Sequence, residues 1–375
     1  MEPVTHFLTG ACIARAGLRR KTAHATLVAV LAAEAADIDI LWGLAGPVEE
    51  LKHHRGITHT FFAAPLLAAV AVGAVWLFDR WLERRRARRS AGFAPAGGEG
   101  PPAKARQTTH WGWLYLTALL SALSHLFLDW TNNYGLRPFL PFNPRWTTGS
   151  FVFIAEPVLW ALLLLALFAP ALTGLIGGEI GARRQPNRGQ GWAIFALVGM
   201  TVLWGWRYAE HARAQTLVEN TQIASEPVLR MAIEPYPVDP FRWHVILEAQ
   251  DYFQTAEVDT RLGTLESDPR RDIVFKPPVT PAVEAAKRTR LGQVYLDWGQ
   301  WAVVRDLGPV SAPGIEPPQL PAGRAWTTVQ FTDLRFAYSF LGRSRPTGGA
   351  PLAGWVYIVD GHEEAGESMN GREQR

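Results

Sequence analysis

Long apolar runs separate the first 208 residues of this chain from the remainder. Four runs are each about as long as the roughly 20 residues that cross a bilayer core as a helix: 57–79, 111–130, 156–176 and 191–208. Residues 209–375 are polar and rich in Pro and Tyr. The sequence therefore predicts a membrane domain at 1–208 followed by a water-soluble domain at 209–375.

Two further segments near the N-terminus are apolar but less regular. The run at 22–44 is long enough to cross a membrane, yet it carries Glu34, Asp37 and Asp39 near its end. Residues 4–16 are too short to span, so we expect a half-helix packed within the protein. The predicted fold class is a mainly α membrane helical bundle of about five spans plus an N-terminal half-helix, with a C-terminal soluble α+β or β-rich domain.

Basic residues predict the orientation of the spans. They gather in three clusters beside the apolar runs, at 15–21, 80–106 and 183–188. Cytoplasmic loops are enriched in Lys and Arg, and placing all three clusters inside the cell gives alternating spans. The stretch 90–106, rich in Gly, Ala and Pro, then predicts a flexible cytoplasmic linker. A net charge of +3 is too small to indicate a nucleic-acid partner.

Three histidines and an arginine lie within seven residues, at the entrance of the run that begins at 57. Two adjacent histidines point in different directions on any regular element, so we predict His54 and His59 as metal ligands and His53 as a residue that supports a ligand. Imidazole is the commonest metal ligand among side chains. Arg55 suits an anionic group, since its planar fork matches phosphate or carboxylate. The alternative for Arg55 is an interfacial anchor.

A second group of polar residues lies at the ends of two other runs. His125 and Asp129 are four residues apart, so on a helix they share one face. That spacing suits two ligands of one metal, or a ligand and the carboxylate that orients it. If their helix ends at this point, Asp37 and Asp39 can both reach the same metal centre. The alternative is that they are ordinary polar residues of a helix end at the membrane interface. The predicted orientation places all these residues toward the outer side of the membrane.

Nitrogen and carboxylate ligands without thiolates suit a divalent metal: zinc first, with manganese or iron as alternatives. The histidines and acids outnumber the ligands of one tetrahedral ion, so we expect two or three ions. Such a centre activates water and polarises a phosphoryl or acyl oxygen.

Four strings of residues occur in an order that resembles a known family. They are Thr5-His6, Ala36-Asp37-Ile38-Asp39, His54-Arg55-Gly56-Ile57-Thr58-His59, and Ser124-His125 through Asp129 to Asn133-Tyr134-Gly135. They resemble the YdjM-like family of bacterial membrane-bound, predicted metal-dependent hydrolases. Glu156-Pro157 is similar to a later acid-Pro motif, with Glu where Asp is more usual, and Ala36 stands where Pro is common.

The resemblance implies an inner-membrane helical bundle with hydrolase activity. Its ligand pattern is similar to that of zinc-dependent phospholipase C and single-strand nucleases. The metal ligands that it implies are His6, Asp37, Asp39, His54, His59, His125 and Asp129. With these ligands, Arg55 is expected to hold the anion of a lipid or lipid-linked phosphoester, and Glu156 to support a ligand or act as an acid or base. The site and the C-terminal domain are expected on the outer side of the inner membrane.

Two other classes of protein compete with the hydrolase. A transporter or ion channel also contains buried His and Asp, but its polar residues line a path across the whole membrane, whereas here they gather at one level. A non-catalytic scaffold leaves the intramembrane charges unexplained.

The C-terminal part shows no catalytic motif, and its patterning is β-like. Alternating apolar and polar residues predict strands at 241–249 and 326–338, and an apolar run predicts another at 352–360. A helix is expected near 281–296.

Overall fold

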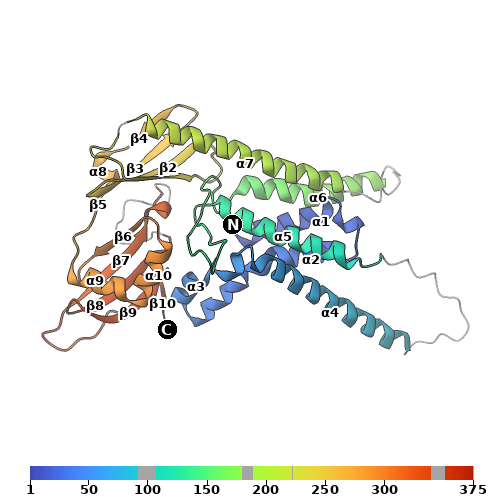
Figure 1. Ribbon diagram of the computed structural model, residues 1–375, viewed down its shortest axis with the longest axis horizontal. Coiled ribbons are helices and arrows are strands. Elements are labelled where there is room, and N and C mark those ends of the chain that lie inside the picture. The colour runs from blue at the N-terminus through green and yellow to red at the C-terminus, as the bar shows by residue number, and fades with distance from the viewer. Residues whose placement is uncertain (92–106, 180–188, 222, 339–350, 375) are drawn as a thin grey trace, which may run out of the picture. The chain divides into compact units, whose positions relative to one another are not determined.

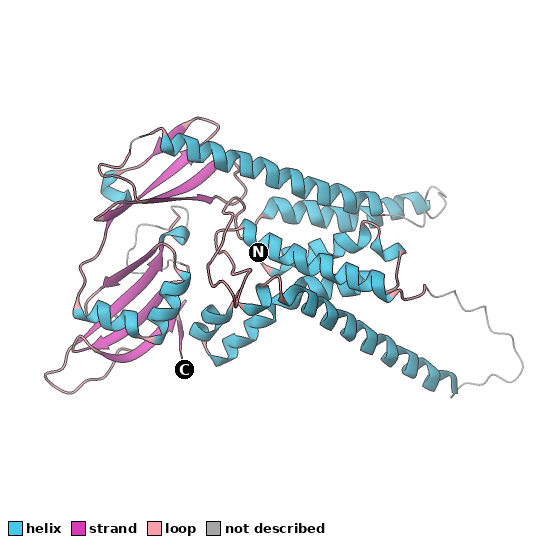
Figure 2. Cartoon of the chain, in the orientation of Figure 1, coloured by secondary structure: helices cyan, strands magenta, loops and turns pink. Residues whose placement is uncertain are grey.

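The structure is a computed structural model that describes residues 1–91, 107–179, 189–221, 223–338 and 351–374. Most of the predicted linker at 90–106 lies outside these residues. The chain forms two compact units, and each is described by itself. The first comprises Met1–Ile38, Ile57–Thr147 and Ile154–Gly205; the second comprises Asp39–Gly56, Thr148–Phe153 and Trp206–Arg375. Figure 2 shows helices along the N-terminal half and strands toward the C-terminus.

The first unit is built from helices (Figure 1). Its α-helices are α1 (Pro3–Arg15), α2 (Ala25–Glu34), α4 (Ala63–Ala91), α5 (Trp111–Thr131), α6 (Pro157–Glu179) and the first half of α7 (Gln190–Glu219). Short 3-10 turns are η1 (Leu18–Arg20) and η3 (Ile57–His59). Helix α1 packs against α2, α5 and α6, and α5 also packs against α2 and α4. Helix α5 therefore lies in the middle of the packed helices.

Two helices of the described chain are long and apolar enough to cross a membrane. They are Ala63–Arg88 within α4 and Trp111–Thr131, which is α5. A shorter apolar helix covers Pro157–Thr173. The helical N-terminal half and the β-rich C-terminal part are as predicted, and α1 is the short helix expected at 4–16. Five spans are not confirmed.

The apolar run at 22–44 is not a single α-helix. Helix α2 ends at Glu34, and the chain continues as the 3-10 helix η2 (Ala35–Ala45). Ten α-helical residues rise only about 15 Å, roughly half of a bilayer core. Asp disfavours helix interiors because its carboxylate competes for nearby backbone groups, which accounts for the end of α2 before Asp37 and Asp39. Long 3-10 stretches are uncommon and often mark strained or functional segments.

Small residues let α1 and α2 approach closely. A Cβ atom at Gly10 would lie 2.8 Å from the carbonyl oxygen of Ala29 and 2.9 Å from the Cβ atom of Ala33. Neither distance is compatible with a side chain at position 10 unless the helices separate. Since His6 lies one helical turn before Gly10, this contact also fixes the position of His6 beside α2.

The second unit contains two antiparallel sheets. The first has the order β1-β2-β3-β4, with β5 also paired to β3: β1 (Arg230–Pro235), β2 (Arg242–Glu248), β3 (Tyr252–Asp259), β4 (Thr264–Glu266) and β5 (Ile273–Phe275). The second has the order β10-β9-β8-β7-β6: β6 (Ala302–Asp306), β7 (Trp326–Asp333), β8 (Gly354–Val359), β9 (Glu363–Met369) and β10 (Arg372–Glu373). The strands predicted at 241–249, 326–338 and 352–360 are β2, β7 and β8.

Helices accompany the second sheet. They are α9 (Pro281–Arg288) and α10 (Arg290–Trp298), while the one-turn helix α8 (Pro269–Asp272) follows β4. The single helix predicted near 281–296 is split at Thr289, whose extended backbone ends α9 and whose hydroxyl accepts a hydrogen bond from the amide of Gly292 at 3.1 Å. Thr289 is thus an N-cap that starts a new helix.

Two segments that the sequence analysis assigns to the membrane domain belong to the second unit, Asp39–Gly56 and Thr148–Phe153. The first contains α3 (Pro47–His53), which packs against α10 and β9. Glu49 on α3 forms an ion pair with Arg290 on α10. Residues 39–56 therefore belong to the same compact unit as the C-terminal sheets.

Candidate metal centre

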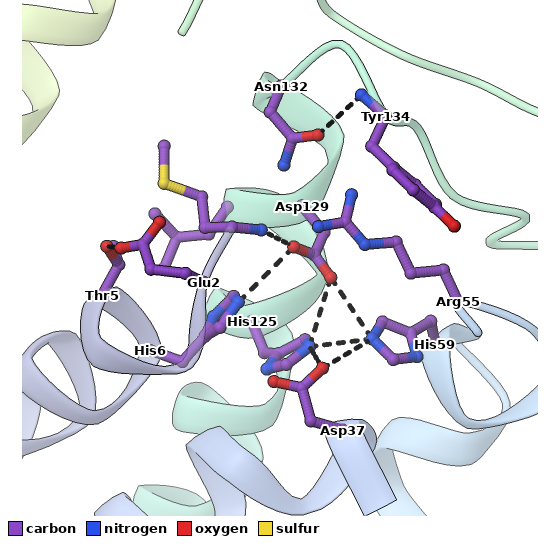
Figure 3. Close-up of polar contacts among 12 residues, drawn as sticks. Glu2, Thr5, His6, Asp37, Arg55, His59, His125, Asp129, Asn132 and Tyr134 are labelled. Carbon is purple, nitrogen blue, oxygen red and sulfur yellow. Dashed lines mark hydrogen bonds and ion pairs between the residues drawn. The ribbon is translucent and has the colours of Figure 1, made fainter. Parts of the chain in front are cut away.

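Five predicted ligands face one another inside the first unit (Figure 3). They come from four elements: His6 on α1, Asp37 on η2, His59 on η3, and His125 and Asp129 on α5. The side chains of the three histidines and of Asp129 are fully buried, and that of Asp37 is 17% exposed. Residues that are far apart in the sequence thus form one polar cluster within an apolar bundle.

Four ligand atoms converge at the centre of this cluster. The Nε2 atom of His59 lies 3.0 Å from Nε2 of His125, 3.3 Å from Oδ1 of Asp37 and 3.3 Å from Oδ2 of Asp129. The Nε2 atom of His125 lies 3.6 Å from the same Asp37 oxygen and 3.2 Å from the same Asp129 oxygen. Tetrahedral zinc with bonds of about 2.0–2.1 Å needs ligand atoms about 3.3–3.4 Å apart. The three atoms from His59, His125 and Asp129 lie 3.0–3.3 Å apart, close to the spacing within a tetrahedral shell, and the Asp37 oxygen lies beside the two imidazole nitrogens.

A backbone carbonyl sets the tautomer of His125. Its Nδ1 atom lies 2.6 Å from the carbonyl oxygen of Ala33. A carbonyl oxygen only accepts hydrogen bonds, so Nδ1 carries the proton and Nε2 of the neutral ring carries the lone pair. Metal-binding histidines are commonly oriented in this way. The Ala33 carbonyl is available because α2 ends at Glu34, and the last carbonyls of a helix lack intrahelical partners.

The ring of His59 is held from its other side. Its Nδ1 atom lies 3.1 Å from the hydroxyl oxygen of Thr58, which directs Nε2 toward His125 and Asp37. His59 ends the 3-10 turn η3, just before α4 begins at Ala63. The turn therefore places the His59 imidazole beside α5, where it contacts His125.

The second oxygen of Asp129 faces α1. Its Oδ1 atom lies 3.4 Å from Nε2 of His6 and also contacts the amino group of Met1. The His6 ring stacks on the His125 ring with a centroid separation of 3.7 Å. On the same helix, Thr5 hydrogen-bonds to Glu2, and the hydroxyl of Thr5 accepts from the Trp160 indole at 2.9 Å. Asp129 thus contacts His6 with one oxygen and both His59 and His125 with the other.

Two overlapping sets of residues could hold a metal ion. One is His59, His125 and Asp129, and the other is His6, Asp37 and His125; within each set the ligand atoms lie within 4.8 Å of one another. His125 belongs to both. Nitrogen and carboxylate donors without thiolates suit zinc, manganese or iron.

Two other predicted ligands, Asp39 and His54, lie in the second unit and contact each other. The Oδ1 atom of Asp39 is 3.1 Å from Nδ1 of His54, and its Oδ2 atom accepts a hydrogen bond from the amide of Arg55 at 2.9 Å. Arg55 is buried and has a left-handed backbone with φ of 53°. The ligand roles of Asp39 and His54, and the anion-binding role of Arg55, stay predictions.

The two remaining predicted site residues differ in their surroundings. His53 stacks on the Trp42 indole at a centroid separation of 4.0 Å, and its Nε2 atom lies 3.6 Å from a Glu49 oxygen. Glu156 is fully buried directly before α6. Their catalytic roles also stay predictions. Ala33 could not be identified from the sequence, because a backbone carbonyl leaves no signal in residue type. Only its place near the end of α2 indicates a carbonyl that can accept a further hydrogen bond.

The second unit contains a buried charged group of a different kind. The Arg335 guanidinium donates to both oxygens of Asp333, at 3.0 and 2.9 Å, and to the Trp298 carbonyl at 3.2 Å. Glu234 on β1 lies nearby and hydrogen-bonds to Ser150. Burial raises the pKa of Glu234 to about 8, although Arg335 opposes this shift. We name Glu234, Asp333 and Arg335 the arginine network.

Residues 1–214 match the family described as YdjM inner membrane protein. The match covers more than half of the 375 residues, so the chain belongs to this family, as its motifs predict. The chain is also similar to YfhP of Bacillus subtilis (strain 168), described as an uncharacterized protein, with 25% identity over 146 residues. That alignment covers 39% of this chain and only 36% of the length of YfhP. No solved structure matches.

Proposed function

We propose that the protein is a metal-dependent hydrolase of the bacterial inner membrane that cleaves a phosphoester in a lipid or lipid-linked substrate. The observation that carries this proposal is the convergence of the His59 and His125 nitrogens and an Asp129 oxygen, 3.0–3.3 Å apart, inside a helical unit. Buried ionisable groups in a membrane bundle are costly and therefore indicate function. Membership of an inner-membrane family supports the location.

The residues of the cluster have distinct tasks. His59, His125 and Asp129 would hold a divalent ion, zinc first, with manganese or iron as alternatives, and Asp37 lies beside them, 3.3 Å from the His59 nitrogen. A bound ion of this kind supplies Lewis acidity and lowers the pKa of water. Oδ1 of Asp129 and Nε2 of His6, 3.4 Å apart, can share a proton at that oxygen and so provide acid–base chemistry beside the centre.

A lipid substrate is supported by exposed aromatic side chains that follow His59. Phe61 packs against Phe139 at a centroid distance of 5.5 Å, and Phe62 against Phe142 at 5.1 Å. All four rings are about half exposed or more. Aromatic side chains are enriched where a protein meets the membrane–water interface. We propose that this aromatic group meets the bilayer at the level where the cluster lies.

The proposed topology retains five spans. Besides α4 and α5, helices α6 and α7 cross the bilayer, and the run 22–44 crosses as the α-helix α2 followed by the 3-10 helix η2. The apolar side chains of η2, among them Leu41 and Leu44, are strongly exposed, as bilayer contact requires. The three basic clusters face the cytoplasm. The cluster and the C-terminal sheets then face outward.

The decisive experiment measures metal in the purified full-length protein by mass spectrometry. Wild type is compared with His59→Ala and His125→Ala, and with His362→Ala as a matched control, because His362 is exposed in the second unit. We expect stoichiometric zinc, manganese or iron in wild type and control, and its loss in both cluster variants. The same samples are then assayed with phosphodiester and phospholipid substrates, where hydrolysis should follow the metal content.

Two outcomes contradict the proposal in different ways. Folded wild-type protein without any bound divalent metal removes the basis for the hydrolase and favours the alternative, a transporter or ion pathway. If the protein binds stoichiometric metal but hydrolyses no phosphodiester, acyl ester or amide, the metal centre stands and the hydrolase activity is refuted.

A further inference from the structure

A cavity of about 600 Å³ lies in the first unit, away from the metal cluster. Its walls include the apolar side chains of Ile13, Leu120 and Leu197, and its basic residues are Arg20 and Lys21. This volume falls in the range of small-molecule sites, about 300–1,000 Å³. An apolar cavity that also carries two cations is suited to an amphiphilic anion.

The charged and apolar parts of the cavity are ordered along two helices. Lys21 lies over the indole of Trp113, 5.4 Å from the ring centroid, near the start of α5. Leu120 follows Trp113 by seven residues, or about 10 Å along the helix. On α7, Gln190 and Leu197 are also seven residues apart, and Gln190 is the residue bonded to Arg20. Both helices therefore run from a basic end to an apolar wall.

The two cations have neutral partners. Arg20 donates to the side-chain oxygen of Gln190 at 3.2 Å, and Lys21 faces an indole ring. More positive charge lies close by, since burial and the charge of Arg15 together lower the pKa of Arg19. The N-termini of α5 and α7 add the positive ends of two helix dipoles. The end of the cavity at Arg20 and Lys21 is therefore positively charged, and no carboxylate takes part in the two contacts just described.

We propose that this cavity binds an anionic phospholipid. Its phosphate lies between Arg20 and Lys21, and one acyl chain lies along Ile13, Leu120 and Leu197. A cationic end followed by an apolar wall of about 10 Å matches a headgroup followed by a chain, whereas a free phosphate would leave the apolar wall uncovered.

The lipid belongs to the leaflet opposite the metal cluster. Trp113 and Asp129 lie 16 residues apart on the same candidate span, which is about 24 Å at 1.5 Å per residue. That separation approaches the thickness of the hydrocarbon core. Basic residues favour the cytoplasmic side, so the lipid site faces the inner leaflet. It is distinct from the proposed hydrolase centre and does not depend on it.

Native mass spectrometry of delipidated full-length protein in detergent tests this site. Dioleoyl phosphatidylglycerol is compared with dioleoyl phosphatidylcholine, so that only the headgroup charge differs. We expect wild type to prefer the anionic lipid, and the double variant R20Q/K21Q to lose about fivefold in affinity for each charge removed. The control R270Q/R271Q removes two exposed charges of α8 and should leave the preference unchanged.

A second variant tests the apolar wall. Leu197→Trp fills the cavity and should weaken the binding of both lipids, with thermal unfolding as the check on folding. Equal binding of the two lipids, or an unchanged preference in R20Q/K21Q, would overturn the proposal. Complete displacement of the anionic lipid by millimolar inorganic phosphate would also overturn it, since the cavity would then recognise the anion alone. If the double variant fails to fold, the single variant Lys21→Gln replaces it, because Lys21 is exposed.

Discussion

The two units bury charge in opposite ways. In the second unit, the carboxylate of Asp333 is matched by the guanidinium of Arg335, which donates to both of its oxygens. In the first unit, the carboxylates of Asp37 and Asp129 face the Nε2 atoms of imidazoles, and His125 is held with its lone pair toward them. Carboxylate oxygens and imidazole lone pairs all donate electrons, so a cation completes such an arrangement. The comparison teaches that one group pairs its charges within the protein, whereas the other gathers electron donors that a bound cation would complete, as we propose.

The strongest way to break this comparison is to remove a ligand. We expect Asp129→Asn to lower the metal affinity more than about 100-fold, since even residues that only orient a ligand contribute 10- to 100-fold. The hydrogen-exchange protection of β7 and β8 should not change. Competition with a fluorescent chelator measures the affinity, and equal affinities in wild type and variant would contradict the metal centre.

The converse change is made in the arginine network. Arg335→Met leaves Asp333 buried beside an apolar side chain, and removing one partner of a buried ion pair costs about 3–5 kcal/mol. We expect faster hydrogen exchange in β1 and β7 with the metal retained.

The matched control is the double variant D333N/R335M, which removes both charges and should recover much of the protection. Loss of metal from Arg335→Met would show that the two units are energetically linked.

Packing of α1 tests how the position of His6 is fixed. Gly10→Ala places a Cβ atom 2.8 Å from the Ala29 carbonyl oxygen, and overpacking of this kind costs about 1–3 kcal/mol. The matched control is Gly73→Ala on α4, where a Cβ atom meets nothing within 4 Å. Unfolding of each variant is followed while a denaturing detergent is added. The free energy of unfolding should fall only for Gly10→Ala. Equal unfolding curves would mean that α1 shifts at no cost.

The last prediction concerns pH, and its effect is small within any one pH unit. Burial raises the pKa of Glu234 to about 8 from the ordinary 4.5, so the folded unit holds a proton that the unfolded chain releases. Its contribution to stability is present below pH 4.5 and is lost as the pH rises through about 8, with a slope of at most about 1.4 kcal/mol per unit. Hydrogen exchange of β1, corrected for intrinsic rates, should show this loss in wild type. A Glu234→Gln variant with the same slope would refute the assignment.

Much of the first unit could be predicted from the sequence because its signals are local. The spacing of four residues places His125 and Asp129 on one face of α5, and the length of the apolar runs predicts α4 and α5. The break after Glu34 could not be located, since an apolar run looks the same whether it continues as an α-helix or tightens into a 3-10 helix. That break places Asp37 and Asp39 in a 3-10 helix and lies next to the Ala33 carbonyl that contacts His125.

The C-terminal part illustrates the same limit. Alternation identified β2, β7 and β8, but the pairing of strands depends on contacts between distant residues. The inclusion of residues 39–56 in that unit was also hidden, because it rests on long-range pairs such as Glu49 with Arg290. Short-range patterns therefore predict where strands occur, whereas the pairing of those strands depends on tertiary contacts that the sequence pattern does not show.

The shared position of His125 limits how ions can be arranged. Its Nδ1 atom is committed to the Ala33 carbonyl, so one lone pair on Nε2 serves both ligand sets. A lone pair binds one ion at a time. An ion that moved from the set with His59 and Asp129 to the set with His6 and Asp37 would keep His125 as a ligand throughout. The two sets would then be alternative binding sites for one ion, and His125 would not bridge two ions bound at the same time.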